Sequence, residues 1–393
     1  MFIVPLLMLL KSHSMKKINF NEPVSIGNPI HFIKKSLSSM KISGDGFFTK
    51  KCNEFFINQF NFRNPLLTSS CTDALEMASI LIDIKYGDEI IAPSFTFVST
   101  VNPFLMRGAK IRFIDSQSVH PNIDADLIEE QISKNTKAIV IVHYAGVSCE
   151  IDKIINLAKK YNLFLIEDCA HALCASFNGV LLGSFGDISV FSFHETKNIS
   201  CGEGGLFLTN RDSFFRRAEI IREKGTNRSA FFRNEVPKYN WVDIGSSFLP
   251  SDFTASLLYS QLISIKKIQS RRISLFNRYL TNFTQLPSNY GVSLPYIPSY
   301  ASNNAHMFYI ICKSFNERSK LIKFLNFKNI YPASHYLPLH LSPFFSNKHD
   351  GRSLKNSVRF SDCLLRLPLH LNLKIKDIDY ISKEIINFYI KEN

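Results

Sequence analysis

Short apolar runs alternate with amphipathic segments between Pro65 and Asn210. The runs are almost continuous, which is typical of strands buried on both faces of a sheet. The segments between them repeat apolar residues at helical spacing. The expected strands are 65–70, 87–93, 109–115, 137–146, 163–172, 188–193 and 206–209, and the expected helices are 73–84, 96–108, 122–133 with Asp124 as N-cap, and 150–162. This alternation predicts an α/β fold with a mixed, mostly parallel sheet between helices.

The pattern changes after Asn210. It loosens over 211–246, where residues 222–241 are polar, aromatic and weakly periodic, which indicates a long loop near a site or an interface. A helical stretch at 251–283 then leads into a strand at 305–313, a helix at 319–329, a strand-and-turn unit at 331–340 and a terminal helix at 376–393. We therefore expect a large domain over 15–260 and a smaller C-terminal α+β domain over 261–393.

In a sheet covered by helices on both faces, ligands bind at the carboxyl ends of the strands. This rule places Thr72, Phe97, His143 and Asp168 around one crevice. The stretch FGDISVFSFHETKNISCGEGG brings Lys197 to the same region, in a turn between two apolar strands and before a glycine run. Glycines let backbone approach a ligand closely. A desolvated lysine amine there is a Schiff-base former, as pyridoxal phosphate (PLP) enzymes require.

Composition adds few constraints. The net charge is +13, but the lysines are scattered, so we expect no nucleic-acid partner. The excess of positive charge is explained either by a compositional bias of the whole chain or by a phosphorylated substrate. The eight cysteines form no C-x-x-C pair and no zinc-like cluster, so we expect no metal and a reducing, cytoplasmic location. The apolar run within residues 1–14 is too short to span a bilayer and makes a poor signal peptide. We expect it to be an extension outside the fold, with no membrane association.

Several residues of the crevice have the chemistry that PLP needs. Asp168 can pair with the pyridinium nitrogen, although a strand-end aspartate is also a common cap or salt-bridge partner, and Glu167 alternates to the opposite face. His171 can meet the cofactor or be structural. Phosphate donors are expected from the helix start at Thr72 and Asp73 and from Ser192. Phe95 or Phe97 can stack on the ring, or belong to the core.

Taken together, these residues resemble the DegT/StrS-type sugar aminotransferases, which have the aspartate-aminotransferase-like PLP fold. The resemblance covers the chain from about Ile18 onward, through the motifs SCTDALEMA, PSFTFVST, VHYAGVSCEID, SFHETKN with GEGG, REKGTNRS, NAHMFYI, HYLPLH and LLRLPL. Within the family they look most like the members that make dTDP-4-amino-4,6-dideoxygalactose for surface polysaccharides.

The resemblance implies that Lys197 binds PLP covalently, Asp168 pairs with its ring nitrogen, His171 lies against it and Phe97 stacks on it. Thr72, Asp73 and Ser192 would bind its phosphate. Family members in which histidine replaces the lysine are dehydratases; this chain keeps lysine, which favours transamination. Arg228, His335 and His340 are the expected substrate contacts. Relatives often carry Asn or Arg near Gly245 for a phosphate contact across the dimer, where this chain has Ser247 and Leu249.

The implied reaction transfers the amino group of L-glutamate to dTDP-4-dehydro-6-deoxy-D-glucose in a homodimer with shared active sites. Two alternatives stay open. The nucleotide could be UDP or GDP with the same chemistry, or the chain could be a regulator that holds PLP without turnover.

Overall fold

Seven strands form one twisted sheet in the computed structural model, which describes residues 17–23 and 26–392. The extension expected at 1–14 lies outside the described residues. Along the sheet the strands are β1 (Leu66–Thr68), β9 (Gly205–Thr209), β8 (Ile188–Ser192), β5 (Phe164–Asp168), β4 (Thr136–Val142), β2 (Glu89–Pro93) and β3 (Lys110–Ile114). Strand β9 is antiparallel to both neighbours, and the other pairs are parallel. The expected mixed, mostly parallel sheet is confirmed.

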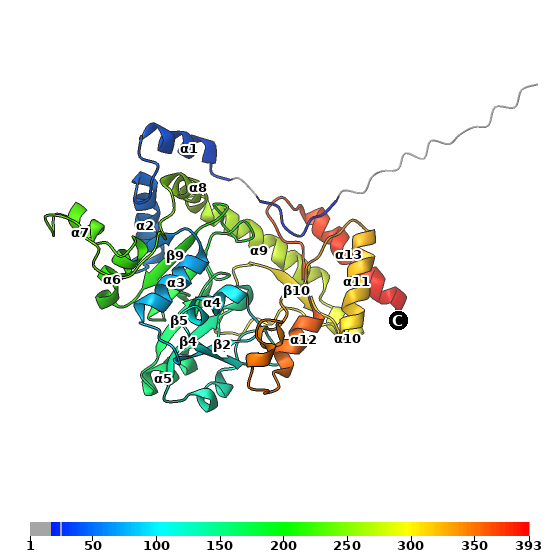
Figure 1. The fold of residues 1–393 in the computed structure, drawn as a ribbon. Coiled ribbons are helices and arrows are strands. Elements are labelled where there is room, and N and C mark those ends of the chain that lie inside the picture. The colour runs from blue at the N-terminus through cyan, green and yellow to red at the C-terminus, as the bar shows by residue number, and fades with distance from the viewer. Residues whose placement is uncertain (1–16, 24–25, 393) are drawn as a thin grey trace, which may run out of the picture.

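Helices cover both faces of this sheet, which explains why its strands are mostly apolar (Figure 1). Successive residues of β4 alternate between the two cores: Ile139 and Ile141 belong to one, Ala138 and Val140 to the other. The first core contains α2 (Phe47–Phe60), α5 (Ile151–Lys160) and α8 (Asp252–Leu262). The second contains α3 (Cys71–Leu81), α4 (Asn102–Leu105) and α6 (Asp212–Arg222).

Three expected helices are shorter or broken. The 96–108 segment forms a 3-10 turn at Val98–Thr100 and then α4, which begins at Asn102 with Pro103 in its first turn. The 122–133 segment forms only 3-10 turns, because the expected Asp124 cap accepts the N–H of Asp126 and closes a tight turn. The 251–283 stretch is two helices, α8 and α9 (Ile265–Asn282).

The C-terminal part has its own core. Strands β10 (Phe308–Ile311) and β11 (Leu364–Leu367) pair antiparallel and pack with α9, α11 (Phe315–Phe327) and α13 (Ile375–Glu392). The expected strand at 331–340 is absent: its Pro332 and Pro338 cannot donate to a ladder, and only Ala333 bridges to Arg366. The domain boundary near residue 260 stays a prediction.

The remaining elements lie at the edges. They are α1 (Pro29–Ser38), α7 (Arg228–Phe232) in the expected long loop, α10 (Leu286–Tyr290), α12 (Lys355–Cys363) and the small hairpin β6 (Ser176–Phe177) with β7 (Val180–Leu181). All eight cysteines are free thiols, and six are buried. Of the helices in the described ranges, none is long and apolar enough to cross a membrane.

Candidate active site

A cavity of about 430 Å³ opens at the carboxyl ends of the central strands. This volume is in the range of small-molecule sites. Seven of the residues singled out from the sequence line it: Thr72, Phe97, Asp168, His171, Ser192, Lys197 and His335. The sheet therefore brings together side chains that are far apart along the chain.

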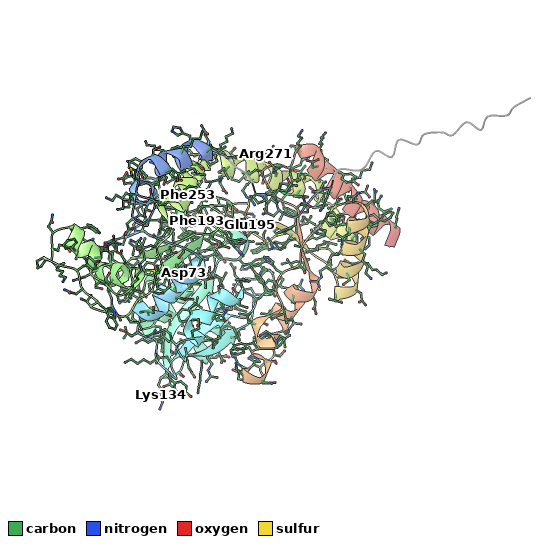
Figure 2. The ribbon with its side chains drawn as sticks, turned by 45° about the horizontal axis from the view of Figure 1, so that its top comes forward. Asp73, Lys134, Phe193, Glu195, Phe253 and Arg271 are labelled. Carbon is green, nitrogen blue, oxygen red and sulfur yellow. The ribbon has the colours of Figure 1, made fainter. Side chains whose placement is uncertain are left out.

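Lys197 reaches the cavity from the turn between β8 and β9. The turn closes through a hydrogen bond from the Lys197 N–H to the His194 carbonyl oxygen, 2.9 Å long. Figure 2 labels Glu195, in the same turn, near the middle of the molecule. Within the described ranges the Lys197 amine has no hydrogen bond or ion pair. Burial and, to a smaller extent, the charge of Arg366 lower its pKa to about 8, against the opposing effects of Cys71 and Asp168.

This pKa has a measurable consequence for the cofactor-free chain. An amine with a folded pKa of about 8 is neutral between pH 8 and its ordinary 10.5, where the unfolded chain would carry an ammonium. The folded state then binds fewer protons, so burying Lys197 costs stability below pH 8 and this cost disappears as the pH rises toward 10.5. We expect acylation of Lys197, followed by peptide mass spectrometry, to show a midpoint near pH 8. A midpoint shared with the exposed lysines would contradict the burial of this amine.

Asp168 ends β5 and is buried in the cavity wall. Its Oδ2 accepts a hydrogen bond from the Thr100 hydroxyl at 2.8 Å, and its Oδ1 accepts one from the Ala170 N–H at 3.1 Å. Burial raises the pKa of this carboxyl above its ordinary value, while Thr100, Ala170 and the charge of Lys197 oppose the shift. Both oxygens are thus oriented before any ligand arrives.

The preceding carboxylate, Glu167, points to the opposite face of β5, as strand alternation predicts. It accepts hydrogen bonds from the His143 ring at 3.0 Å, from three backbone N–H groups of the loop 183–186, and from the Ser189 hydroxyl. Burial opposes its ionisation, but these donors together hold the pKa of Glu167 below its ordinary value. The expectation that His143 faces the crevice is not met, because its ring is buried against Glu167.

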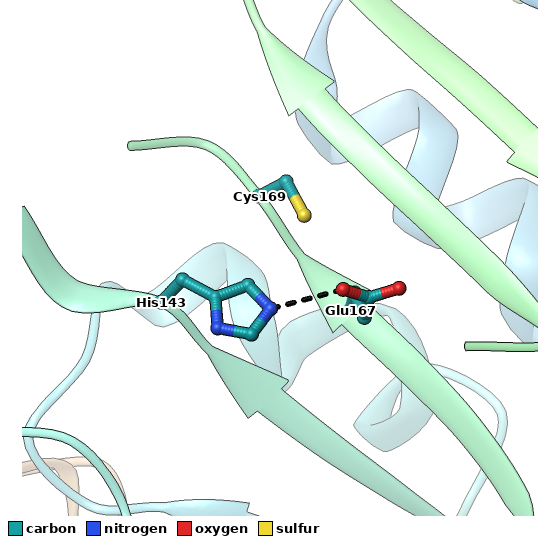
Figure 3. Close-up of side chains that lie close together, drawn as sticks. All are labelled: His143, Glu167 and Cys169. Carbon is teal, nitrogen blue, oxygen red and sulfur yellow. Dashed lines mark hydrogen bonds and ion pairs between the residues drawn. The ribbon is translucent and has the colours of Figure 1, made fainter. Parts of the chain in front are cut away.

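His143, Glu167 and Cys169 form a compact cluster of potential metal ligands (Figure 3). Both ring nitrogens of His143 and both carboxylate oxygens of Glu167 are already hydrogen-bonded. His143 Nδ1 accepts the Cys149 N–H at 3.2 Å while Nε2 bonds Glu167, and burial raises the pKa of the Cys169 thiol well above its usual range. The cluster therefore fixes the end of β5, and with it Asp168, without needing an ion.

Replacing Glu167 by glutamine should destabilise the fold. The amide would turn one N–H group toward the loop donors and remove the charge that they share, at a cost of about 3 kcal/mol or more. The midpoint of urea unfolding of the cofactor-free chain measures this, with Glu129→Gln, an exposed partner of Lys160, as the control. Because the folded pKa is depressed, the stabilisation is present above pH 4.5 and is lost as the pH falls further. Equal midpoints for both variants would contradict this role.

The start of α3 lies in the wall of the same cavity as Lys197 and has the features of an anion site. The N–H groups of a first helical turn have no acceptor within their helix. Around them lie three hydroxyls of the cavity wall: Thr72, which donates to Ser99 at 2.8 Å, Ser99 itself, and Ser192 at the end of β8. Gly205 fixes this arrangement, because a Cβ there would collide with the backbone of Ser70 and Cys71. The glycine run predicts a close backbone approach, and in the structure the backbone of Gly205 approaches the start of α3.

Asp73 lies at the same helix start (Figure 2) but does not line the cavity. Its N–H donates to the capping Ser70 hydroxyl at 3.0 Å, and its carboxylate accepts from Ser69 at 2.5 Å. In this arrangement Asp73 closes the cap and turns its charge away from the anion site.

Of the two aromatic residues in PSFTF, one belongs to the core and the other lines the cavity. Phe95 is buried in the core against Tyr144 and Tyr336. Phe97 is 55% exposed and lines the cavity, with its ring 6.2 Å from that of Tyr336. Phe97 is therefore the ring available for stacking.

Three of the histidines that line the cavity lie close together. The rings of His171 and His306 stack at 4.4 Å, and His335 lies 6.3 Å from His171 in a nearly parallel plane. Burial lowers the pKa of all three, and the charge of Lys197 adds to the effect. These imidazoles are neutral at pH 7, so they can hydrogen-bond a ligand without adding charge.

Two expected substrate contacts lie elsewhere. Arg228, in α7, pairs with Glu223 at 2.5 Å and packs over Phe232. His340 is buried, with Nδ1 2.6 Å from the Ser94 hydroxyl. Neither lines the cavity.

Four of the cavity residues that had no role predicted from the sequence are Thr100, His306, Tyr336 and Arg366. Three come from the C-terminal part, whose placement over the sheet depends on contacts between distant segments. Arg366 carried a signal, since it is a charge inside the apolar run LLRLPL.

The cavity fits PLP. An amine without a partner among the described residues, a buried carboxylate, an exposed aromatic face and a helix start with hydroxyls line one space of suitable volume. Lys197, Asp168, Phe97, Thr72 and Ser192 are the residues that would hold it.

Comparison with known proteins agrees with this chemistry. The model of the DegT/DnrJ/EryC1/StrS aminotransferase family matches residues 28–386. GDP-perosamine synthase of Escherichia coli O157:H7 is 30% identical over 376 residues, covering 95% of this chain and 99% of its own. The spore coat polysaccharide biosynthesis protein SpsC of Bacillus subtilis is 30% identical over 332 residues, covering 82% and 85%.

Among solved structures, the PLP form of Spr1654 from Streptococcus pneumoniae superimposes with a TM-score of 0.86 at 24% identity, covering 96% of this chain and 99% of its own. It shares the fold. PLP is the family's cofactor, and its members are sugar-nucleotide aminotransferases that act in polysaccharide biosynthesis. By the match of nearly its whole length, this chain belongs to the DegT/DnrJ/EryC1/StrS aminotransferase family.

Proposed function

We propose that this aminotransferase converts dTDP-4-dehydro-6-deoxy-D-glucose and L-glutamate into dTDP-4-amino-4,6-dideoxy-D-galactose and 2-oxoglutarate, for a surface polysaccharide of the enterobacterial common antigen or O-antigen type. The placement of Lys197 and Asp168 in one cavity, beside the helix start of α3, is the observation that carries the proposal. The resemblance of SFHETKN, GEGG and REKGTNRS to the dTDP-sugar members supports the choice of substrate.

The residues of the cavity have different roles in the proposed reaction. When bound, PLP supplies an electron sink that stabilises negative charge at the carbon that loses a proton. The Lys197 amine removes the proton from the α-carbon of L-glutamate and, in the second half of the reaction, delivers a proton to C4 of the sugar. Its lowered pKa keeps a useful fraction of the amine neutral near pH 8. Asp168 holds a proton on the ring nitrogen, and Thr72, Ser99 and Ser192 orient the phosphate.

A GDP-linked 4-keto-6-deoxy sugar is the second candidate. The relative that matches 95% of this chain is named for a GDP sugar, perosamine. A UDP-linked sugar would use the same residues around the reacting carbon, because the nucleotide lies away from that carbon.

The test is a single-turnover reaction of the enzyme previously loaded with the amino group of L-glutamate. Equal concentrations of dTDP-, UDP- and GDP-linked 4-keto-6-deoxyglucose are compared side by side, and NMR of the product gives the configuration at C4. We expect the dTDP sugar to react fastest and to give the galacto product. Faster conversion of the GDP sugar would replace the proposal by its alternative, and a gluco product would refute the assigned stereochemistry.

We also propose that two copies share their active sites. In such a dimer Arg228 would contact the substrate bound by the other copy. This would explain why Arg228 pairs with Glu223 and lies outside the cavity of its own chain. Ser247, whose backbone bridges Glu223, and Leu249 stand where relatives often carry the residue that crosses to the partner's phosphate. Contacts of Asp73 with the phosphate, and of His335 and His340 with the substrate, stay predictions.

A further inference from the structure

Arg366 is a nearly buried cation without an acid partner. It stands in β11 between Leu365 and Leu367, is 8% exposed, and lines the cavity. Within residues 17–23 and 26–392 it forms no ion pair. Its Nε donates to no atom, and its Nη1 contacts only the ring nitrogen Nε2 of His335.

The other buried arginines show how unusual this is. Arg222 pairs with Asp45, Arg272 donates to three backbone carbonyl groups, and Arg318 donates to the Ser361 carbonyl. Each of them therefore has an oxygen acceptor, whereas Arg366 has none in the described part of the chain. A guanidinium remains charged at neutral pH, and burying it without an acceptor is costly. An anion entering the cavity would offset that cost.

The surroundings hold the guanidinium in place. Its carbon lies 4.2 Å from the centre of the Phe20 ring, in a cation–π contact. Phe20 belongs to an N-terminal strap that is itself fixed: Ile18 pairs with Ile330, and the Asn21 side chain donates to the Glu195 carbonyl oxygen. On the other side, His335 is oriented by the Tyr144 hydroxyl at 3.0 Å.

We propose that Arg366 binds a carboxylate of the amino donor, and that Phe20 is the positioning residue that holds its guanidinium for this contact. The inference rests on the proposed function, because it assumes an amino-acid donor. A planar guanidinium matches a carboxylate through two parallel hydrogen bonds. Arg366 sits in the wall of the same cavity as Lys197, so one small molecule can reach both. A nucleotide diphosphate is bulkier, and an 8%-exposed group offers it little surface.

Binding of glutarate to the PLP-loaded enzyme, measured by titration calorimetry, tests this contact. Glutarate has the carboxylates of the donor but no amine, so it cannot react. Arg366→Gln should weaken its binding at least about tenfold, the effect of a lost charged hydrogen-bond pair, and Phe20→Leu about threefold. Arg278→Gln, which removes an exposed pair with Asp379, should leave it unchanged. Binding of dTDP should be the same in all four proteins.

The half-reaction with L-glutamate gives a second readout. Arg366→Gln should raise the donor concentration needed for half-maximal rate by a similar factor, and Arg366→Lys should recover only part of the loss. Unchanged glutarate binding in Arg366→Gln, or weakened dTDP binding instead, would overturn the inference. If the native enzyme uses another amino acid, the proposed donor is wrong, and the same comparison with that amino acid decides the role of Arg366. If the enzyme does not convert dTDP sugars, the proposed function is wrong, but the role of Arg366 in binding the donor is unaffected.

Discussion

Replacing Lys197 by alanine is expected to abolish transamination, with a loss of at least about 10³-fold, while PLP stays bound through noncovalent contacts. The amine is the only group in the cavity that combines a pKa of about 8 with freedom from protein partners in the described residues. The neighbouring imidazoles have pKa values lowered by burial, so they are weak bases. His171 and His306 are therefore poor substitutes for Lys197 in the proton transfer.

Single-turnover reaction with L-glutamate measures the loss, and mass spectrometry after borohydride reduction should find the cofactor on the Lys197 peptide of the native enzyme alone. Lys197→Arg is the matched variant, since it keeps the positive charge but not a basic amine near pH 8, and it should be equally inactive. Lys160→Ala, which removes an exposed partner of Glu129, should behave as the native enzyme. Measurable turnover by Lys197→Ala would refute the assignment.

Asp168→Asn should lower the rate by about 10²–10³-fold, the effect typical of removing one group that stabilises charge in a buried site. An amide has the shape of the carboxylate but cannot hold a proton on the ring nitrogen. The fold is expected to tolerate the amide, because its oxygen can accept from the Ala170 N–H while the Thr100 hydroxyl turns to donate to Thr96 and accepts from the NH₂. Single-turnover kinetics with L-glutamate are the measurement.

The adjacent residue provides the contrast for this variant. Asp168→Asn should lose activity with a small change in the urea midpoint, whereas Glu167→Gln should mainly lose stability. If the two variants behaved alike in both measurements, the division of roles between the two faces of β5 would be wrong. A rate within threefold of the native enzyme for Asp168→Asn would contradict its pairing with the cofactor.

Much of the sheet could be predicted because its strands are buried on both faces, so the sequence marks them as apolar runs. Lys197 and Asp168 followed from this, since strand ends meet at one edge of a parallel sheet. Glu167 followed from alternation. Helix lengths were less predictable at 96–108 and 122–133, because local caps and Pro103 compete with helical spacing there.

The cavity residues of the C-terminal part could not be predicted from local sequence patterns. His306 and Arg366 lie opposite the sheet because distant segments pack together, and no local pattern states that packing. His340 was expected at the substrate on its type and motif alone, and only the tertiary structure shows that Ser94 occupies its ring. Arg228 gave no local sign of its pair with Glu223 either, although the two residues are close in sequence.

The contact between Gly205 and the start of α3 links two parts of the site mechanically. Gly205 is paired with Ser192 across β8 and β9, so these two residues close the loop that carries Lys197, while Gly205 also abuts Ser70 and Cys71. The two points that would grip opposite ends of the cofactor are thereby set at a constant separation. The site would therefore select ligands by their length. An aromatic aldehyde without the phosphate arm would contact Lys197 but not the start of α3.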